Sequence, residues 1–230
     1  MRVVLLASGS GTLTQSVLDA CVTRDTGAAG VDATGSNAAE ANTVEVVAVG
    51  SDRPQAPVLE RARAAGVPSF VVAPRDHADR AAWDAALTEE VASFRPDWVV
   101  SAGFMRILGR TFVEAFAGRI INSHPALLPA FPGAHAVREA LAHGVKVTGP
   151  TFHLVDTGLD SGPIIAQFPV PVEDTDTEET LHERIRAVER VRLVELLTWL
   201  STGTLAVEGR RVTGFVPGPL PPTPTPDRAG

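Results

Sequence analysis

The stretch from 121 to 135, INSHPALLPAFPGAH, gathers side chains that suit carbonyl chemistry. Asn122 and His124 stand two residues apart just past a predicted strand, so their side chains project to the same side if the end of that strand stays extended. The prolines that follow restrict the backbone and can hold a site rigid without secondary structure. An amide and an imidazole beside a stiff apolar loop predict a site for a reacting carbonyl.

A carboxylate far along the chain is the third candidate. Asp160 lies in LDSGP, a turn flanked by glycine. Asn122 can donate to the oxyanion of a tetrahedral intermediate, and a protonated His124 adds a charged donor that can pass a proton. A nearby Asp160 is expected to raise the pKa of His124. Together they suit acyl transfer to an amine that the substrate supplies. The alternative is structural: the asparagine caps a turn, and the histidine is a hydrogen-bonded loop residue.

The segment LLASGSGTLTQSVLDA predicts a strand, a glycine-rich turn and a helix whose first N–H groups face an anion. Thr14 stands where the dinucleotide fingerprint has its third glycine, and the lysine of a nucleotide-triphosphate loop is missing. What remains is a pocket for a single phosphate made by Gly11, Thr12 and the N–H of Leu13. The alternative is a tight turn that binds nothing.

The other histidines give little support for a metal. His124 and His135 are eleven residues apart in a loop, without paired cysteines or helical histidine spacing, which disfavours zinc. The remaining histidines are expected in two places: His77, His143 and His182 at the surface, and His153 as a hydrogen-bonded residue of the core.

Short Val- and Ile-rich runs alternate with segments of helical period, which is typical of a parallel sheet wrapped by helices. The expected fold class is α/β, a Rossmann-like, mostly parallel twisted sheet with helices on both faces. The predicted strands are Val3 to Leu6, Val44 to Val49, Ser69 to Val72, Trp98 to Ala102 and Ile120 to Asn122. Between the third and fourth, Trp83, Leu87, Val91 and Phe94 share one helical face. Ligands of such sheets gather beyond the carboxyl ends of the strands.

The second half predicts two further strands, Thr148 to Val155 and Ile164 to Val172, joined by the turn that holds Asp160. A long amphipathic helix follows, with Asp176 and Glu179 as its capping box. Its apolar stripe comprises Leu181, Ile185, Val188, Leu196 and Leu200. LAVEGRRVTGF suggests a closing hairpin.

Composition favours one soluble domain. The chain has 230 residues, 44% of them hydrophobic, and a formal charge of −7 without a basic run, which disfavours nucleic acid as a partner. One cysteine, Cys21, and the lack of a signal sequence or membrane span favour the cytoplasm. We expect a catalytic domain over 1–216, with 22–42 as an inserted surface loop, and a proline-rich disordered tail over 217–230.

Three collinear motifs resemble the phosphoribosylglycinamide (glycinamide ribonucleotide) formyltransferases of purine synthesis. They are SAGFMRILG, INSHPALLPAFPGAH and HLVDTGLDSGPIIAQ, and the similarity runs from Met1 to about Phe215 apart from the insertion. The resemblance implies that 10-formyltetrahydrofolate, as co-substrate and without a metal, gives its formyl group to the amine of glycinamide ribonucleotide. It also implies direct transfer without a covalent enzyme intermediate.

The resemblance implies these site residues: Asn122, His124 and Asp160 as the catalytic trio; Gly11, Thr12, Leu13 and Arg186 for the phosphate and Glu189 for the ribose; and Arg80, Met105, Arg106, Ile107, Leu108 and Asn122 for the folate. Two departures stand out. Many members carry asparagine where this chain has Leu13, and the 22–42 insertion is longer than expected.

Related enzymes on the same domain are the alternatives. Formyltetrahydrofolate deformylases usually add an N-terminal domain, and methionyl-tRNA formyltransferases add a more basic C-terminal one. This chain starts at the first strand and ends in its proline tail, so we expect neither addition. A non-catalytic nucleotide-binding module is the rival of another class, but it would not require the trio. Small-molecule substrates and a monomer or homodimer, without nucleic acid or membrane, are expected.

Overall fold

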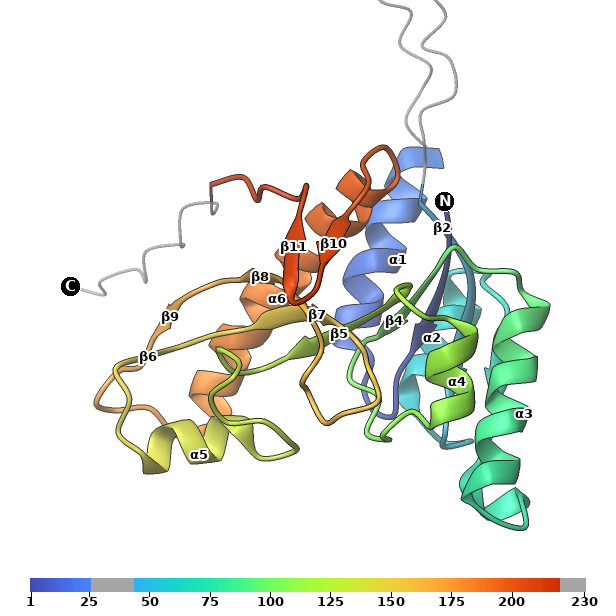
Figure 1. Ribbon diagram of the computed structural model, residues 1–230, viewed down its shortest axis with the longest axis horizontal. Helices are drawn as coiled ribbons and strands as arrows, with labels where there is room; N and C mark the ends of the chain where they lie inside the picture. Colours follow the sequence, from blue (N-terminus) through green and yellow to red (C-terminus); the bar gives the residue numbers. More distant parts are fainter. Residues whose placement is uncertain (26–43, 220–230) are drawn as a thin grey trace, which may run out of the picture.

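A nine-stranded mixed sheet forms the centre of the protein in the computed structural model, which describes residues 1–25 and 44–219 (Figure 1). The strand order is β10-β11-β8-β7-β5-β4-β1-β2-β3. Five strands from the first half run parallel: β1 (Arg2–Leu6), β2 (Glu45–Ser51), β3 (Ser69–Val71), β4 (Trp98–Ser101) and β5 (Ile120–His124). The predicted Rossmann-like α/β sheet is therefore confirmed.

Helices cover both faces of the sheet because its central strands are apolar on both sides. In β1, Val3 and Leu5 pack into one core cluster while Val4 and Leu6 pack into another, and all four are fully buried. The first cluster is closed by α1 (Thr12–Asp25), α2 (Pro57–Ala64) and α6 (Glu178–Leu200), and the second by α3 (Arg80–Ser93) and α4 (Arg110–Ala115). A 3₁₀ turn, η1 (Pro74–Asp76), precedes α3, and α5 (Ala136–Ala142) packs against α6.

Each of the two long strands predicted in the second half is interrupted. The first divides into β6 (Val147–Thr148) and β7 (Thr151–Leu154), and the second into β8 (Ile164–Gln167) and β9 (Val170–Pro171). Gly149 adopts φ +139°, where a side chain would collide with the backbone of Phe168, and Pro150 has no N–H for a ladder. As a result β7 and β8 join the large sheet, and β6 pairs with β9 in a separate two-stranded sheet.

The cap of α6 lies one residue later than predicted. Thr177 is the N-cap: its hydroxyl oxygen accepts from the Thr180 N–H, and its own N–H donates to the Thr180 hydroxyl. Asp176 instead forms an ion pair with Arg184 at 2.7 Å. The predicted apolar stripe is confirmed, because Leu181, Ile185, Leu196 and Leu200 are buried and Val188 packs beside them.

The ends of the two predicted irregular segments are ordered. Residues 22–25 continue α1, so that part of the predicted insertion is helical, while 26–43 lie outside the described residues. The predicted hairpin is confirmed as β10 (Ala206–Glu208) and β11 (Arg211–Thr213), and β11 joins β8. At the start of the predicted tail, Gly218 bonds Arg192 and Glu195 of α6; residues 220–230 lie outside the description.

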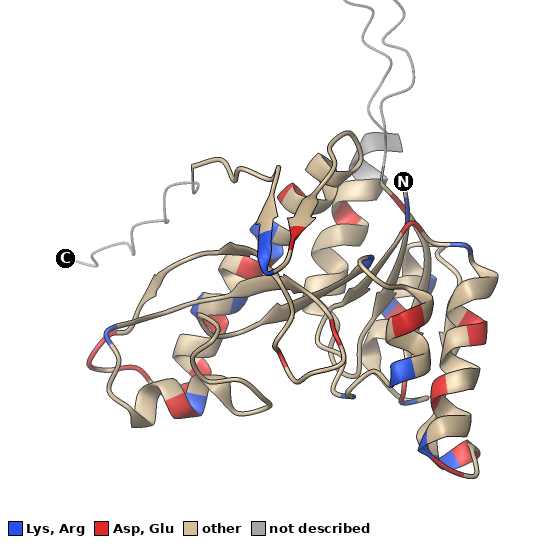
Figure 2. Ribbon diagram, in the orientation of Figure 1, with Lys and Arg blue, Asp and Glu red and all other residues tan. Residues whose placement is uncertain are grey.

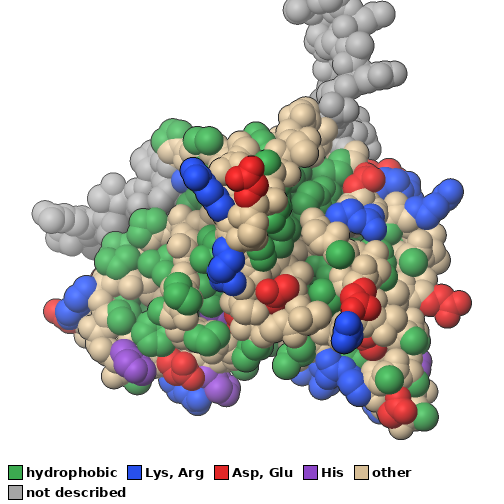
Figure 3. Space-filling model, in the orientation of Figure 1, with side chains coloured by type: hydrophobic (Ala, Val, Ile, Leu, Met, Phe, Trp, Pro, Cys, Tyr) green, Lys and Arg blue, Asp and Glu red, His purple; other side chains and the backbone are tan. Residues whose placement is uncertain are grey.

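The visible face carries both signs of charge. Acidic and basic residues are interspersed over the outer helices in Figure 2. The space-filling view of the same face shows charged side chains scattered among exposed hydrophobic ones (Figure 3). Within the described ranges, no helix is both long and apolar enough to span a bilayer.

Candidate active site

Strand β5 places Asn122 and His124 on one face of the sheet. The strand runs to His124, two residues further than predicted, so the extended spacing needed for the two side chains to share a face is confirmed. Antiparallel β7 sets His153 directly opposite Asn122. The His153 Nδ1 lies 3.0 Å from the Leu154 carbonyl, which can only accept, so Nδ1 carries the proton. The Nε2 of His153 then accepts from the Asn122 amide at 3.1 Å, which fixes the orientation of that amide.

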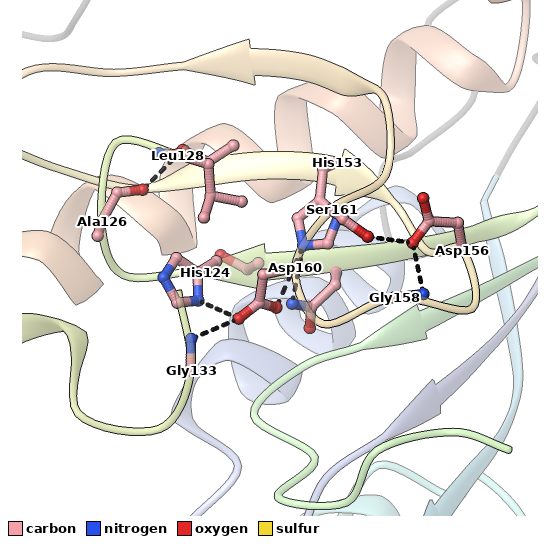
Figure 4. A network of polar contacts seen from close by, with 12 residues as sticks. His124, Ala126, Leu128, Gly133, His153, Asp156, Gly158, Asp160 and Ser161 are labelled. Atoms are coloured by element: carbon pink, nitrogen blue, oxygen red, sulfur yellow. Dashed lines mark hydrogen bonds and ion pairs between the residues drawn. The ribbon is translucent and has the colours of Figure 1, made fainter. Parts of the chain in front are cut away.

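His124 lies between two hydrogen-bond acceptors. Its Nε2 is 2.8 Å from the carbonyl of Phe131. Its Nδ1 is 3.3 Å from a carboxylate oxygen of Asp160 (Figure 4). Phe131 and Asp160 have φ values of +53° and +49°, a region that few non-glycine residues occupy. The backbone is thus strained at the two residues that hold the imidazole, and such strain is concentrated at functional sites.

Asp160 reaches the histidines from the turn between β7 and β8. Its carboxylate accepts from the Gly133 N–H at 2.8 Å and lies 3.7 Å from the Nε2 of His153, so one side chain ties the proline-rich loop to the central strands (Figure 4). Burial raises the pKa of Asp160, but the contacts with His153, Gly133 and His124 together lower that pKa below its ordinary value. Asp160 is therefore a carboxylate at neutral pH.

Asp160 raises the pKa of His124, as expected, but the net shift of that pKa is downward. The side chain is 4% exposed, and burial lowers its pKa more than the Asp160 charge and the Phe131 carbonyl raise it. The sequence motif revealed the partner but not the depth of burial. The lowered pKa favours the neutral imidazole, which can take up a proton when negative charge develops beside it.

The proline-rich loop forms a fixed wall, as its sequence predicts. Ala126 and Leu128 are buried, and the Thr151 hydroxyl both donates to the Ala126 carbonyl at 2.6 Å and accepts from the Leu128 N–H at 3.0 Å. Gln167 donates to the Leu128 carbonyl at 2.7 Å. These bonds from β7 and β8 satisfy a loop that has no regular structure of its own.

A cleft of about 720 Å³ opens at the carboxyl ends of the central strands. This is where ligands of open α/β sheets bind, and the volume suits a small-molecule site. The predicted site residues that line it are Gly11, Thr12, Leu13, Met105, Arg106, Ile107, Leu108, Asn122, His124, Asp160, Arg186 and Glu189. Arg80 is the exception: it lies outside the cleft at the start of α3 and donates to the carbonyl of Ile107.

The glycine-rich turn lies at one end of this cleft. Gly11 has φ +69°, and α1 begins at Thr12, so the N–H groups of its first turn have no acceptor within the helix. Leu13 is 9% exposed and contributes its backbone rather than its side chain. The turn therefore offers an anion several backbone donors.

Gly11→Ala is expected to damage this end of the cleft. A Cβ at that position would collide with Val58 of α2, and the left-handed φ disfavours any side chain. We expect a loss of about 1 to 3 kcal/mol in the free energy of unfolding, measured by urea titration. The KM for the ligand that binds this turn should also rise. Gly66→Ala is the matched control, because it has the same φ, no neighbour within 4 Å and no place in the cleft.

Helix α6 supplies the opposite wall. Glu189 is buried and accepts from the Ser123 hydroxyl at 2.6 Å, and Arg186 lies one turn earlier. His182, predicted at the surface, also lines the cleft and is half-buried there. Burial, and then the charge of Arg186, lower the pKa of His182. The position of His182 on the long helix did not predict that it lines the cleft, because the face that meets the cleft depends on how α6 crosses α1.

Sequence reasoning placed His153 correctly in the core but missed its contact with Asn122. A histidine inside a predicted strand can be assigned a partner only when the strand register is known. The histidines weighed as a zinc pair are separated: His124 uses both ring nitrogens as described above, and exposed His135 precedes α5. Over residues 1–25 and 44–219, no group of three potential His, Cys, Asp or Glu ligands is suitably arranged for a metal.

An open α/β sheet with an amide donor, an imidazole and a carboxylate at the carboxyl ends of its strands has the groups that suit an enzyme acting on a carbonyl group. Comparison with known proteins narrows the class. Residues 1–197 match the formyl transferase family model. The chain belongs to the formyl transferase family.

Relatives cover nearly the whole chain. The phosphoribosylglycinamide formyltransferase of Mycobacterium tuberculosis is 53% identical over 212 residues, which is 92% of this chain and 90% of that protein. The Escherichia coli enzyme of the same name is 37% identical and covers 89% of each chain. The structure of glycinamide ribonucleotide transformylase 1 from Symbiobacterium toebii matches with a TM-score of 0.83 and 42% identity, covering 94% of both chains.

Proposed function

We propose that this formyl transferase moves the formyl group of 10-formyltetrahydrofolate to the amine of glycinamide ribonucleotide, giving formylglycinamide ribonucleotide and tetrahydrofolate in purine biosynthesis. The relatives with this activity support the substrates. The observation that carries the proposed site is the His124–Asp160 contact of 3.3 Å, on the same face of β5 as the Asn122 amide. The reaction takes place where these three groups meet.

In the first step the substrate amine attacks the formyl carbon. A carbon–nitrogen bond forms, and the carbonyl electron pair moves to oxygen to give a tetrahedral oxyanion. Asn122 donates its second amide hydrogen to this oxygen, since the first is held by His153. The amide is already oriented before substrate arrives, so little reorganisation opposes the step.

Proton transfer follows through His124. The attacking nitrogen carries a positive charge and loses its proton to the unprotonated Nδ1 of His124. The Nε2–H of His124 continues to donate to the Phe131 carbonyl. The resulting imidazolium pairs with Asp160 and with the oxyanion, both of which favour its charge. The oxyanion electron pair then re-forms the carbonyl as the carbon–nitrogen bond to folate breaks, and His124 gives its proton to the departing folate nitrogen. The lowered pKa of His124 suits this role, since the base must be unprotonated at the start.

The two substrates occupy different ends of the cleft in this proposal. The ribonucleotide phosphate binds the N–H groups of Gly11, Thr12 and Leu13, with Arg186 as a cationic partner. Glu189 holds the ribose hydroxyls. The folate lies along the backbone of residues 105–108, next to Asn122.

Glu189→Gln tests the ribose contact. The KM for glycinamide ribonucleotide should rise about tenfold or more, the size of one lost hydrogen bond to a charged group, with the KM for folate unchanged.

Burial raises the pKa of Glu189, so its contribution to stability is full below its unfolded pKa and is lost as pH rises through the folded value. The variant, which cannot titrate, should therefore gain stability relative to the wild type as pH rises. Equal urea midpoints for Glu189→Gln and the wild type at every pH would contradict the raised pKa of Glu189.

The assay that tests the function follows tetrahydrofolate formation from 10-formyltetrahydrofolate with and without glycinamide ribonucleotide. We expect turnover only when both are present. Turnover that ignores the ribonucleotide would identify a deformylase, which is the alternative on this domain. Transfer to initiator methionyl-tRNA in place of the ribonucleotide would identify the tRNA enzyme.

A further inference from the structure

The loop between β4 and α4, residues 103–108, forms the proposed folate wall of the cleft, and packing anchors it only through the buried side chains of Phe104 and Leu108. Met105 and Ile107 are 65% and 60% exposed. Arg106 also lines a second cavity of about 590 Å³, which shares part of its lining with the cleft. A ligand that binds largely to backbone groups needs that backbone held in one shape. Polar contacts must therefore hold the exposed middle of the 103–108 loop, between the buried Phe104 and Leu108.

The carboxyl end of the loop is held by Asp84 of α3. This side chain is buried, and its two oxygens accept from the Gly109 N–H at 2.7 Å and the Phe112 N–H at 3.2 Å. Asp84 thus caps α4 from a different helix, because Gly109 at the N-cap position has no side chain of its own. A Cβ at Gly109 would collide with the carboxylate, so the glycine makes room for this cap.

The middle of the loop is held by Asp52, at the end of β2, and by Ser8. Asp52 accepts from the Nε of Arg106 at 2.7 Å, and the Ser8 hydroxyl accepts from the Met105 N–H at 2.8 Å. The Asp52 side chain is fully buried, yet among the described residues its second oxygen has no hydrogen-bond partner. A buried carboxylate with a hydrogen bond on only one oxygen lowers stability. The burial of Asp52 is therefore better explained by its role in orienting Arg106.

We propose that Asp52 and Asp84 are positioning residues that keep the 103–108 loop in the shape that binds folate. This inference rests on the proposed folate wall. Neither carboxylate touches the substrates: Asp84 acts through the start of α4, and Asp52 acts through the side chain of Arg106. The phosphate turn and α6 lie on other elements, so ribonucleotide binding should be independent of both anchors.

Kinetics of Asp84→Asn and Asp52→Asn test this proposal, with Glu89→Gln, exposed on α3, as the matched control. In Asp84→Asn the amide offers one acceptor oxygen in place of two and turns a donor toward one of the two N–H groups, so the Gly109 end of the loop is held less firmly. We expect the KM for 10-formyltetrahydrofolate to rise about tenfold, the effect of one lost hydrogen bond to a charged group, while the KM for the ribonucleotide stays within about twofold. The control should match the wild type. Hydrogen exchange at Met105 and Gly109 should be faster in the corresponding variants.

Equal rises in both KM values, or unchanged values with a lower kcat, would overturn the proposal. Asp84→Ala removes both bonds and should show the larger folate effect; if it does not fold, the isosteric Asp84→Asn decides. Failure of the proposed function is distinguishable, because the wild type itself would then not use 10-formyltetrahydrofolate. The exchange measurement still decides in that case: unchanged exchange at Met105 and Gly109 in the variants would refute the positioning role.

Discussion

His124→Ala should lower the rate of formyl transfer by about 10² to 10⁴, the contribution of a positioned acid–base group. The substitution removes the only ring that contacts both the Phe131 carbonyl and the Asp160 carboxylate in the described structure. Substrate binding should change little, since the phosphate turn and α6 are untouched. Steady-state kcat and both KM values, measured with saturating co-substrate, check this expectation.

The pH profile gives the same prediction a second readout. His124 must be unprotonated to accept a proton, so the rate should fall as pH drops through its lowered pKa. Asp160→Asn removes a charge that raises that pKa, so the acid limb should move to lower pH. His135→Ala, at an exposed position outside the cleft, is the control and should retain the wild-type rate and profile. An acid limb that stays in place in Asp160→Asn would separate Asp160 from the proton transfer.

Asn122→Ala should reduce kcat by about 10² to 10³, as expected when one donor to an oxyanion is removed. The fold should persist because Asn122 is partly buried and the β5–β7 ladder is made by the backbone. Stopped-flow single-turnover rates separate the chemical step from product release. Unfolding in urea with an unchanged midpoint would show that the loss is catalytic.

His153 allows a graded comparison with that variant. His153→Phe keeps a planar aromatic ring, slightly larger than imidazole, but leaves the Asn122 amide without its acceptor, so the amide can rotate. The rate should fall by less than in Asn122→Ala, because the donor is still present. A rate below that of Asn122→Ala would mean that His153 takes a direct part in the reaction.

The parallel half of the fold is readable from sequence because its central strands contain short hydrophobic runs that are buried. Val3 to Leu6 and Ile120 to Asn122 fall within strands for this reason. The second half was harder, because Gly149 and Pro150 interrupt an apolar run whose continuity suggested one strand. The α6 cap was misplaced because Asp176 and Thr177 are both good capping residues, and the choice depends on the ion pair with Arg184.

Residue types and the family motifs identified Asn122, His124 and Asp160, but their meeting depends on contacts between distant segments. The antiparallel register of β7 and the turn after it bring Asp160 to the imidazole. Local sequence carries no information on burial, which is why the net downward shift of the His124 pKa was not predicted. The roles of Asp52 and Asp84 could not be predicted from the sequence, because their hydrogen-bond partners lie on other elements of the fold.

A double-mutant cycle on His124 and Asp160 tests the central claim most directly. If the two act as one proton-handling pair, formyl transfer by His124→Ala/Asp160→Asn should be no slower than by His124→Ala alone. The reason is that Asp160 then affects the reaction only through the imidazole of His124, which is already absent. If the double variant instead loses the product of the two single effects, the residues work independently, and the assignment of their contact as the catalytic pair is wrong.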